Sequence, residues 1–314
     1  MSSAIKQIQC SKAGKFLEVL NNRNPVWNKE RRFWIFRGHN DNIYRLIPSA
    51  LRSSAELGFT HKPKKGIQPS NSEQIEAEFE RLQEFFWACD AQGLNVPVEG
   101  NMLRTPDSYK NLLDNIERQW PCDELLPLMA LAQHYGINTR LLDWTENPLT
   151  AAHFAAISSI EFQQGVSKLS DKDMAVWALN LDWLIHDAFP ASGKGKMTIS
   201  IVTAPRASNP NLDAQGGVFT VELLDKKDQQ KVGKTNARTV DEIVESRWQE
   251  LNWQTPVMLH ITLPGIEKNK LLRLLYKEGV DISSLFPGYQ GVAYAIKERF
   301  YWDKQERPLC WTKR

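Results

Sequence analysis

Apolar and polar residues alternate with a period of two in several short segments, which is the pattern of β-strands. The first is 32–37, whose aromatic and aliphatic residues lead into Phe36, Arg37 and Gly38. Because glycine can turn in any direction, Gly38 is predicted to end this strand, with Arg37 at its end. An extended segment is expected at 139–144, and the later strands are predicted at 174–181, 197–202, 217–223 and 256–263.

In other segments the apolar residues recur at helical spacing. Ser70 and Glu73 have the spacing of a capping box, so a helix is predicted to follow Ser70 and to continue through Cys89. Two further helices are predicted to end at the glycines Gly136 and Gly279, because glycine adopts the left-handed conformation that closes a helix. The predicted helices after the first begin near 123, at 148, at 267 and at 290.

The order of these elements predicts the fold class. Helices are expected mostly in the N-terminal half and strands mostly later, which favours an α+β fold over a doubly wound sheet. No break in composition divides the chain. We therefore expect a single compact domain with a mainly antiparallel or mixed sheet, and irregular segments at 53–70 and 92–111.

Composition adds little to this picture. The chain has 314 residues, 42% hydrophobic and 24% charged, which is ordinary for a globular protein. No apolar run approaches the roughly 18 residues that span a bilayer, and the N-terminus lacks the plan of a secretion signal. We expect a cytoplasmic protein without a membrane partner.

Charge and cysteine content exclude several classes of function. A formal net charge of +2 provides no strong overall attraction to nucleic acid. The four cysteines are scattered singly, with no histidine at metal-ligand spacing, so neither structural zinc nor a disulfide framework is predicted. The sequence motifs of the commonest serine hydrolases and zinc proteases do not occur.

Polar groups of several kinds are concentrated at 133–145, beside apolar residues that predict a strand. Burying such groups is costly unless they are paired. Strand alternation places Asp143 and Thr145 on one face, just before a helix N-terminus that favours phosphate or carboxylate. Arg37 also needs an anionic partner, and a phosphate suits its guanidinium. The alternative is internal: Arg37 or Arg140 pairs with Asp143, and His134 only caps a helix.

Several segments together resemble the FRG domain family. The similarity runs in order over about 30–300 and predicts one FRG-type domain for 1–314. The family resemblance implies a bacterial or phage-linked occurrence, often near defence or toxin loci. The segments that carry it are Phe36-Arg37-Gly38-His39, Tyr44-Arg45-Leu46-Ile47-Pro48-Ser49, Arg52, the block 133–155, Arg206, Gln215-Gly216-Gly217-Val218-Phe219-Thr220 and Leu285-Phe286-Pro287-Gly288.

A second resemblance, to ADP-ribosyltransferases of the arginine–serine–glutamate type, implies a mechanism. Arg37 and Gly38 match the first motif of that family, in which the arginine would hold the phosphates of NAD. Asp143-Trp144-Thr145 is similar to the second motif, in which a hydroxyl would position the nicotinamide ribose. An ADP-ribosyltransferase-like core is therefore expected.

The third motif departs from the family, because Gln215 stands where a catalytic glutamate is expected. Cleavage of the nicotinamide–ribose bond needs an oriented dinucleotide and a carboxylate that stabilises positive charge or activates the acceptor. Gln215 can hydrogen-bond the ribose but cannot take a proton. Asp143 or Glu222 would have to supply that function, or His134 would act as the base.

The leading hypothesis is an NAD-dependent ADP-ribosyltransferase-like toxin or anti-phage defence effector with a protein or nucleic-acid acceptor. The alternatives are a non-catalytic module that binds a nucleotide or partner without turnover, and a nuclease. An antitoxin or another regulatory partner is compatible with each, and no metal is expected. The resemblance implies a catalytic set of Asp143, Thr145, His134, Gln215 and Glu222, and a cofactor-binding set of Arg37, Gly38, Tyr135, Arg140, Trp144 and Phe154.

Overall fold

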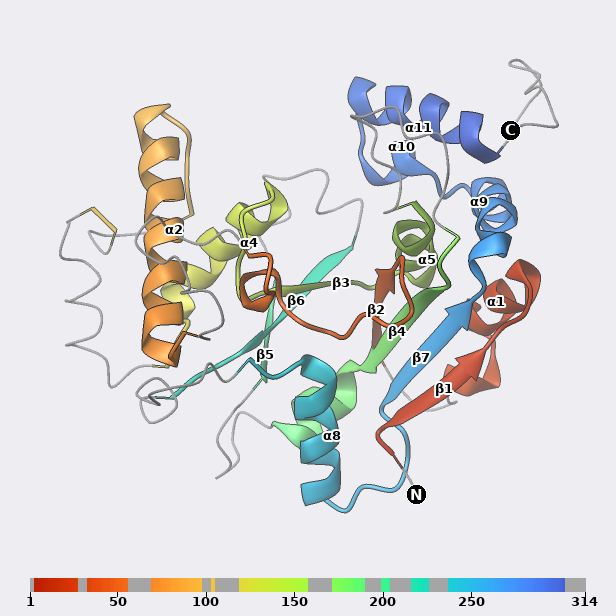
Figure 1. Cartoon of the computed structure of the whole chain (residues 1–314), viewed down its shortest axis with the longest axis horizontal. Coiled ribbons are helices and arrows are strands. Elements are labelled where there is room, and N and C mark those ends of the chain that lie inside the picture. Colours follow the sequence, from red (N-terminus) through yellow and green to blue (C-terminus); the bar gives the residue numbers. More distant parts are fainter. Residues whose placement is uncertain are drawn as a thin grey trace.

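The strands of the protein form one mixed sheet. The computed structural model describes residues 3–27, 33–55, 69–97, 103–104, 119–157, 171–189, 199–203, 216–225 and 237–302. Within these residues the sheet has seven strands in the order β1-β7-β4-β2-β3-β6-β5 (Figure 1). The α+β class and the mixed sheet predicted from the sequence are confirmed.

The strands pair mainly antiparallel. Only β1 and β7 are parallel among the described pairs. The bounds are β1 Ile5–Gln9, β2 Trp34–His39, β3 Leu142–Thr145, β4 Met174–Asn180, β5 Ile199–Val202, β6 Gly217–Glu222 and β7 Met258–Leu263.

The central strands β2 and β3 are only loosely joined. β2 pairs with β4 along its whole length, whereas its described pairing with β3 is confined to Phe36 and Thr145. Because the ladder does not continue past this pair, the sheet leaves room between β2 and β3 for the side chain of Arg37.

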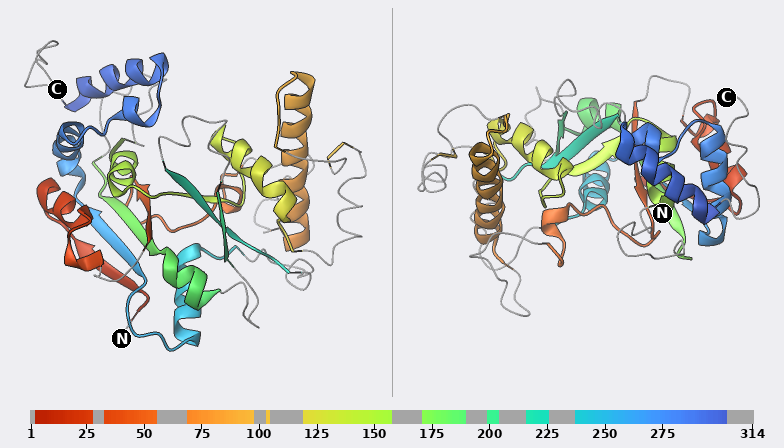
Figure 2. Two further views of the ribbon diagram at one scale, coloured as in Figure 1. Left: turned by 180° about the vertical axis from the view of Figure 1, so that it is seen from behind. Right: turned by 90° about the horizontal axis from the view of Figure 1, so that it is seen from above.

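Helices cover both faces of the sheet. The described α-helices are α1 Ala13–Leu20, α2 Asn71–Ala91, α4 Leu126–His134, α5 Pro148–Ile157, α8 Val240–Glu250, α9 Lys268–Lys277, α10 Ile282–Leu285 and α11 Tyr289–Trp302. Seen from above, α2 and α4 lie towards one end of the molecule and α9 and α11 towards the other (Figure 2). Shorter helical segments, among them η2 Ser49–Leu51 and η4 Trp183–Ala188, connect these elements.

The core has two parts on one face of the sheet and a third on the other. Phe36 packs with α1, α5 and α9, whereas its neighbour Ile35 packs with η4 and α8. In the same way Leu141 packs with α2 and α4, and Leu142 packs with the α8 side. This alternation follows from the period of two in a strand.

Local sequence signals fixed several boundaries correctly. Ser70 caps α2 and accepts a hydrogen bond from the Glu73 N–H at 3.3 Å, while the Glu73 carboxylate accepts one from the Ser70 N–H at 2.7 Å. Gly136 and Gly279 follow α4 and α9 with positive φ, as predicted. These predictions succeeded because capping depends on a few neighbouring residues.

Other expectations need correction. β2 does not end at Gly38, because Gly38 pairs with Val176 and the strand continues to His39. The sequence patterns did not predict β1, α1 or α8. Most of the irregular segments expected at 53–70 and 92–111 lie outside the described residues, as does the beginning of the strand expected at 197–202.

The contact between α5 and β2 is unusually close at Gly38. A Cβ atom on this residue would lie 2.0 Å from the Ala151 carbonyl oxygen and 2.7 Å from the Ala155 nitrogen. The helix presents alanines on this side, and Ala151 and Ala155 are fully buried. Only glycine at position 38 allows the backbones of the helix and the strand to approach in this way.

We expect Gly38→Ala to destabilise the protein by about 1–3 kcal/mol or more, because the added methyl group forces α5 away from β2. Urea unfolding measures the change. Gly14→Ala in α1 is the matched control, since its added Cβ meets no atom within 4 Å; it should stabilise by up to about 1 kcal/mol through helix propensity. Equal stability of Gly38→Ala and the wild type would contradict the close packing of α5.

Candidate functional site

A pocket of about 370 Å³ opens over the centre of the sheet, on the face covered by α4 and α5. Its volume lies at the lower end of the ~300–1,000 Å³ typical of ligand pockets. We call it the central pocket. β2, β3 and β6 form its floor, and its lining residues include Arg37, Gly38, Asp143, Thr145 and Phe219 from the strands, Gln133 and His134 from α4, Phe154 from α5, and Phe286.

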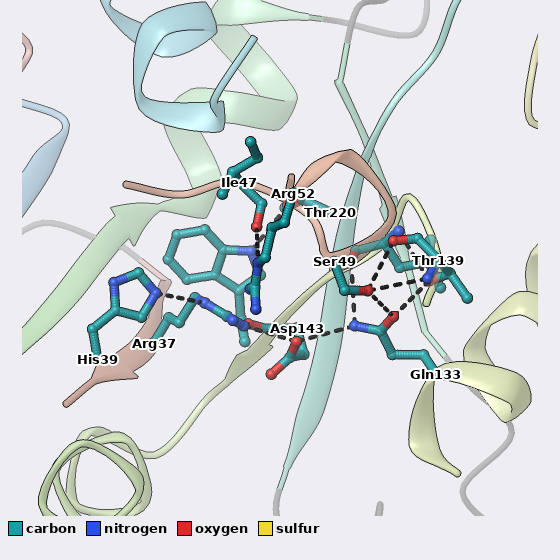
Figure 3. A network of polar contacts seen from close by, with 11 residues as sticks. Arg37, His39, Ile47, Ser49, Arg52, Gln133, Thr139, Asp143 and Thr220 are labelled. Atoms are coloured by element: carbon teal, nitrogen blue, oxygen red, sulfur yellow. Dashed lines mark hydrogen bonds and ion pairs between the residues drawn. The ribbon is translucent and has the colours of Figure 1, made fainter. Parts of the chain in front are cut away.

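Arg37 crosses the gap between β2 and β3. Its Nη1 atom lies 2.8 Å from Oδ1 of Asp143 and donates a hydrogen bond of 2.6 Å to the Asp143 carbonyl oxygen (Figure 3). The Arg37 side chain is 12% exposed, whereas that of Asp143 is 57% exposed. The pair is therefore open to the pocket on the carboxylate side.

Asp143 is held in its ionised form. Gln133 donates a hydrogen bond of 3.2 Å from Nε2 to Oδ1 of Asp143, and its own Oε1 accepts one of 2.6 Å from Thr139. Desolvation by the surrounding protein raises the pKa of Asp143, but the charge of Arg37 and the hydrogen bonds from Arg37 and Gln133 together hold it below its ordinary value. This engaged carboxylate is a weak proton acceptor.

Arg52 adds a second guanidinium to the same network. Its Nε donates to the Ile47 carbonyl oxygen at 3.2 Å, and Figure 3 shows the group directed towards Arg37 and Asp143. Desolvation, followed by the charge of Arg37, lowers the pKa of Arg52, and Asp143 opposes the shift. Arginine remains protonated near neutral pH in any case. Two cations and one anion leave a positive charge beside the pocket.

His39 orients Arg37. It is buried, its Nε2 accepts a hydrogen bond of 3.0 Å from Arg37 Nε, and its Nδ1 lies 3.2 Å from the Tyr44 carbonyl oxygen. These partners require the neutral tautomer with the proton on Nδ1. Burial, followed by the charge of Arg37, lowers the pKa of His39 to about 3, so the ring stays neutral.

Aromatic side chains line another part of the pocket. Phe154 and Phe286 meet edge to face, with ring centroids 6.2 Å apart. Since Phe286 follows α10, this wall is assembled from segments far apart in the sequence. His134 also lines the pocket, and desolvation lowers its pKa. The central pocket thus combines a cationic region with apolar rings.

Thr145 is fixed at the floor of the pocket. It is buried, and its hydroxyl oxygen accepts a hydrogen bond of 3.1 Å from the Asn147 N–H. The Asn147 side chain in turn accepts one of 2.9 Å from the Leu149 N–H at the start of α5. The same turn therefore begins the helix and positions the hydroxyl group.

Arg140 does not belong to the pocket, which corrects its assignment as a cofactor-binding residue. Its guanidinium donates to Glu78 through Nε at 3.0 Å and Nη2 at 2.9 Å. Both side chains are only 1% exposed. The alternative pairing of Arg140 with Asp143 is also wrong, because Glu78 on α2 is the acid that neutralises it.

Three more assignments change. The register of β3 and β6 turns Glu222 and the Trp144 indole to the opposite face, where Glu222 pairs with Arg238 and Trp144 Nε1 donates to Thr220 at 2.9 Å. Trp144 borders the pocket, but its ring belongs to the α8 side of the core. Tyr135 is 68% exposed and lies outside the pocket lining.

The structure nevertheless brings seven of the predicted residues to one pocket. Their chemical roles remain predictions, and Gln215 lies outside the described residues. No role was predicted from the sequence for His39, Arg52, Gln133, Phe219 or Phe286, although each lies within a segment that carries the family resemblance. The seven predicted residues that line the pocket are Arg37, Gly38, His134, Asp143, Trp144, Thr145 and Phe154.

The fold and the site define an α+β protein with a cationic pocket over the central strands. Residues 32–164 match the model of the FRG domain, which confirms the principal resemblance recognised in the sequence. The matched region supplies β2, α4, β3 and α5, and with them most of the pocket lining. The extension of the domain over about 30–300 remains a prediction.

No curated protein and no solved structure matches the chain. Among the described helices, none is long and apolar enough to cross a membrane. The described residues contain no group of three or more histidine, cysteine, aspartate or glutamate side chains that could hold a metal ion.

The neutral state of His39 predicts an acid sensitivity. Since its pKa falls to about 3 in the folded protein, the unfolded chain alone binds this proton below about pH 6.5. Stability should therefore fall as the pH drops from 6.5 towards 3. His39→Gln preserves an acceptor for Arg37. Between pH 7 and pH 5 the free energy of unfolding of this variant should fall by about 1–2 kcal/mol less than that of the wild type.

Urea unfolding at the two pH values tests this expectation. His186→Gln is the control, because His186 is exposed and lies outside the pocket. If His39→Gln and the wild type lose the same stability between pH 7 and pH 5, the prediction that His39 is buried in its neutral form is wrong.

Proposed function

We propose that this protein is an NAD-dependent ADP-ribosyltransferase-like effector, acting as a toxin or in anti-phage defence, and that the central pocket binds NAD. The observation that carries the proposal is the Arg37–Asp143 pair beside an aromatic wall, with the guanidinium of Arg52 close enough to interact electrostatically with both residues. NAD joins a diphosphate to planar aromatic rings, so a site for it needs cationic groups for the phosphates and aromatic surfaces for a ring.

The cationic region suits a phosphate group. Arg37 commits Nε to His39 and Nη1 to Asp143, and among the described contacts its Nη2 has no partner. Arg52 commits only Nε within the described residues. These hydrogen bonds hold both guanidinium groups in place, and their remaining N–H groups suit the forked geometry with which arginine binds phosphate.

The proposed reaction breaks the bond between the ribose carbon and the nicotinamide nitrogen. The electron pair of this bond leaves with nicotinamide, and an acceptor nucleophile forms the new bond to the same carbon and gives up its proton to a base. Thr145, at the floor, would position the ribose. The modest volume suits the nicotinamide riboside half of NAD, with the diphosphate directed towards Arg37 and Arg52.

A binding module without turnover is the second candidate, and the placement of the acids favours it. Asp143 is engaged by Arg37 and Gln133, and Glu222 is turned to the opposite face. Gln215 cannot accept a proton. The same pocket would then recognise a nucleotide or a partner without catalysis.

Incubation with NAD labelled in the adenylate half separates these functions. With a bacterial lysate as the acceptor source, we expect release of nicotinamide and transfer of label to a macromolecule. Saturable NAD binding without nicotinamide release would support the binding module instead. Absence of NAD binding at millimolar ligand would contradict the transferase and would leave only a module that binds a different nucleotide or a partner.

Arg37→Ala should weaken NAD binding about tenfold or more, or roughly 1.5–3 kcal/mol, because it removes a charge-assisted contact with phosphate. The variant should remain folded, since Asp143 is 57% exposed and water can hydrate its freed carboxylate. Calorimetric titration with NAD and thermal unfolding measure the two properties.

Arg104→Ala is the matched control, because Arg104 is half exposed and pairs with Asp90 away from the pocket. It should bind NAD like the wild type. One result would contradict the phosphate role of Arg37. In that case Arg37→Ala and Asp143→Ala would lose the same free energy of unfolding, and the double variant would lose no more than either single variant.

A further inference from the structure

A second pocket, of about 790 Å³, adjoins the central pocket. It lies between α1, the start of β2, the turn from β3 to α5, and the end of α9. Phe36 lines both pockets, and Thr145 of the central pocket is followed directly by Glu146 of the second. A group bound in one pocket is therefore close to a group bound in the other.

The second pocket combines aromatic rings with acidic side chains, and we call it the acidic pocket. Trp27 meets Trp34 and Phe36 edge to face, with ring centroids 5.5 and 5.3 Å away. Glu18, Glu146 and Glu278 contribute carboxylates, of which Glu18 also pairs with the exposed Lys15 at 2.7 Å. No lysine or arginine occurs among the described residues that line it.

We infer that the acidic pocket receives the basic side chain of a protein acceptor, an inference that rests on the proposed transfer from NAD. Carboxylates repel the phosphates of nucleic acid and attract a cation. Of the two kinds of acceptor left open by the sequence, protein and nucleic acid, this charge favours protein. Aromatic rings favour arginine in particular, because its planar guanidinium stacks on ring faces.

Glu146 stands at the border of the two pockets. Its N–H donates a hydrogen bond of 3.1 Å to the Gly216 carbonyl oxygen, so it lies beside the start of β6, where the third motif of the transferases is expected. Glu146 thus offers a carboxylate close to the motif in which the sequence has Gln215. Glu146 takes the proton of the acceptor nitrogen as that nitrogen bonds to the ribose carbon and nicotinamide leaves with the electron pair.

A binding measurement without NAD tests the acidic pocket alone. The probes are two blocked five-residue peptides with a central arginine or its neutral analogue citrulline. We expect the arginine peptide to bind roughly five- to tenfold more tightly, from its charge and its contact with the rings. Glu18→Gln/Glu278→Gln should weaken the preference, because only Glu146 and the rings remain, and Glu250→Gln, an exposed site outside this pocket, should keep it unchanged.

Equal binding of the two peptides, or a preference that the double substitution leaves unchanged, would overturn the assignment. Competition by a single-stranded oligonucleotide would overturn it as well. Thermal unfolding of the double variant checks that it is folded, which is expected because Glu18 is exposed at the surface.

A transfer measurement then separates this inference from the proposed function. With labelled NAD, label should pass to the arginine peptide, and Glu146→Gln should slow transfer roughly 100-fold or more while NAD still binds. Arginine-dependent binding with no transfer by the wild type would refute the proposed function and leave the pocket assignment standing. Transfer to nucleic acid instead would refute the protein acceptor, and unchanged transfer by Glu146→Gln would refute the base.

Discussion

The close approach of α5 to β2 at Gly38 is the constraint on which the site depends. α5 begins shortly after β3, and its backbone lies directly against β2. This packing brings Phe154 on α5 to the wall of the central pocket. The turn that starts the helix also holds Thr145. A side chain at position 38 would move all of these groups together, so packing and site geometry cannot be separated here.

The loose junction of β2 and β3 distinguishes Arg37 from an arginine that only supports the fold. Arg140 illustrates the structural case, because it and Glu78 are both nearly inaccessible and satisfy each other with two hydrogen bonds. Arg37 lies instead between neutral His39 and exposed Asp143, with Arg52 nearby. Such an arrangement is fixed by the protein yet keeps donors available, as binding a charged ligand requires.

The parts of the fold predicted from the sequence are those set by neighbouring residues, such as the capping box at Ser70 and the face shared by Asp143 and Thr145. β1 was missed because polar residues interrupt its apolar pattern at an edge of the sheet. The partner of Arg140 was beyond local reasoning, since Glu78 is 62 residues away. The pocket depends on similar long-range contacts, which explains why Phe286 was assigned no role.

The position of the catalytic acid links the fold to the choice between enzyme and binding module. Glu222 follows Thr220 by two residues on β6, so both side chains lie on the face of the Trp144 indole. Moving Glu222 to the pocket would require a one-residue slip, which would also turn Phe219 out of the pocket floor and Val221 out of the core. If the pocket is catalytic, its carboxylate must therefore come from another element. The turn before α5 carries Glu146 at the edge of the pocket, and the contact at Gly38 fixes the position of that turn.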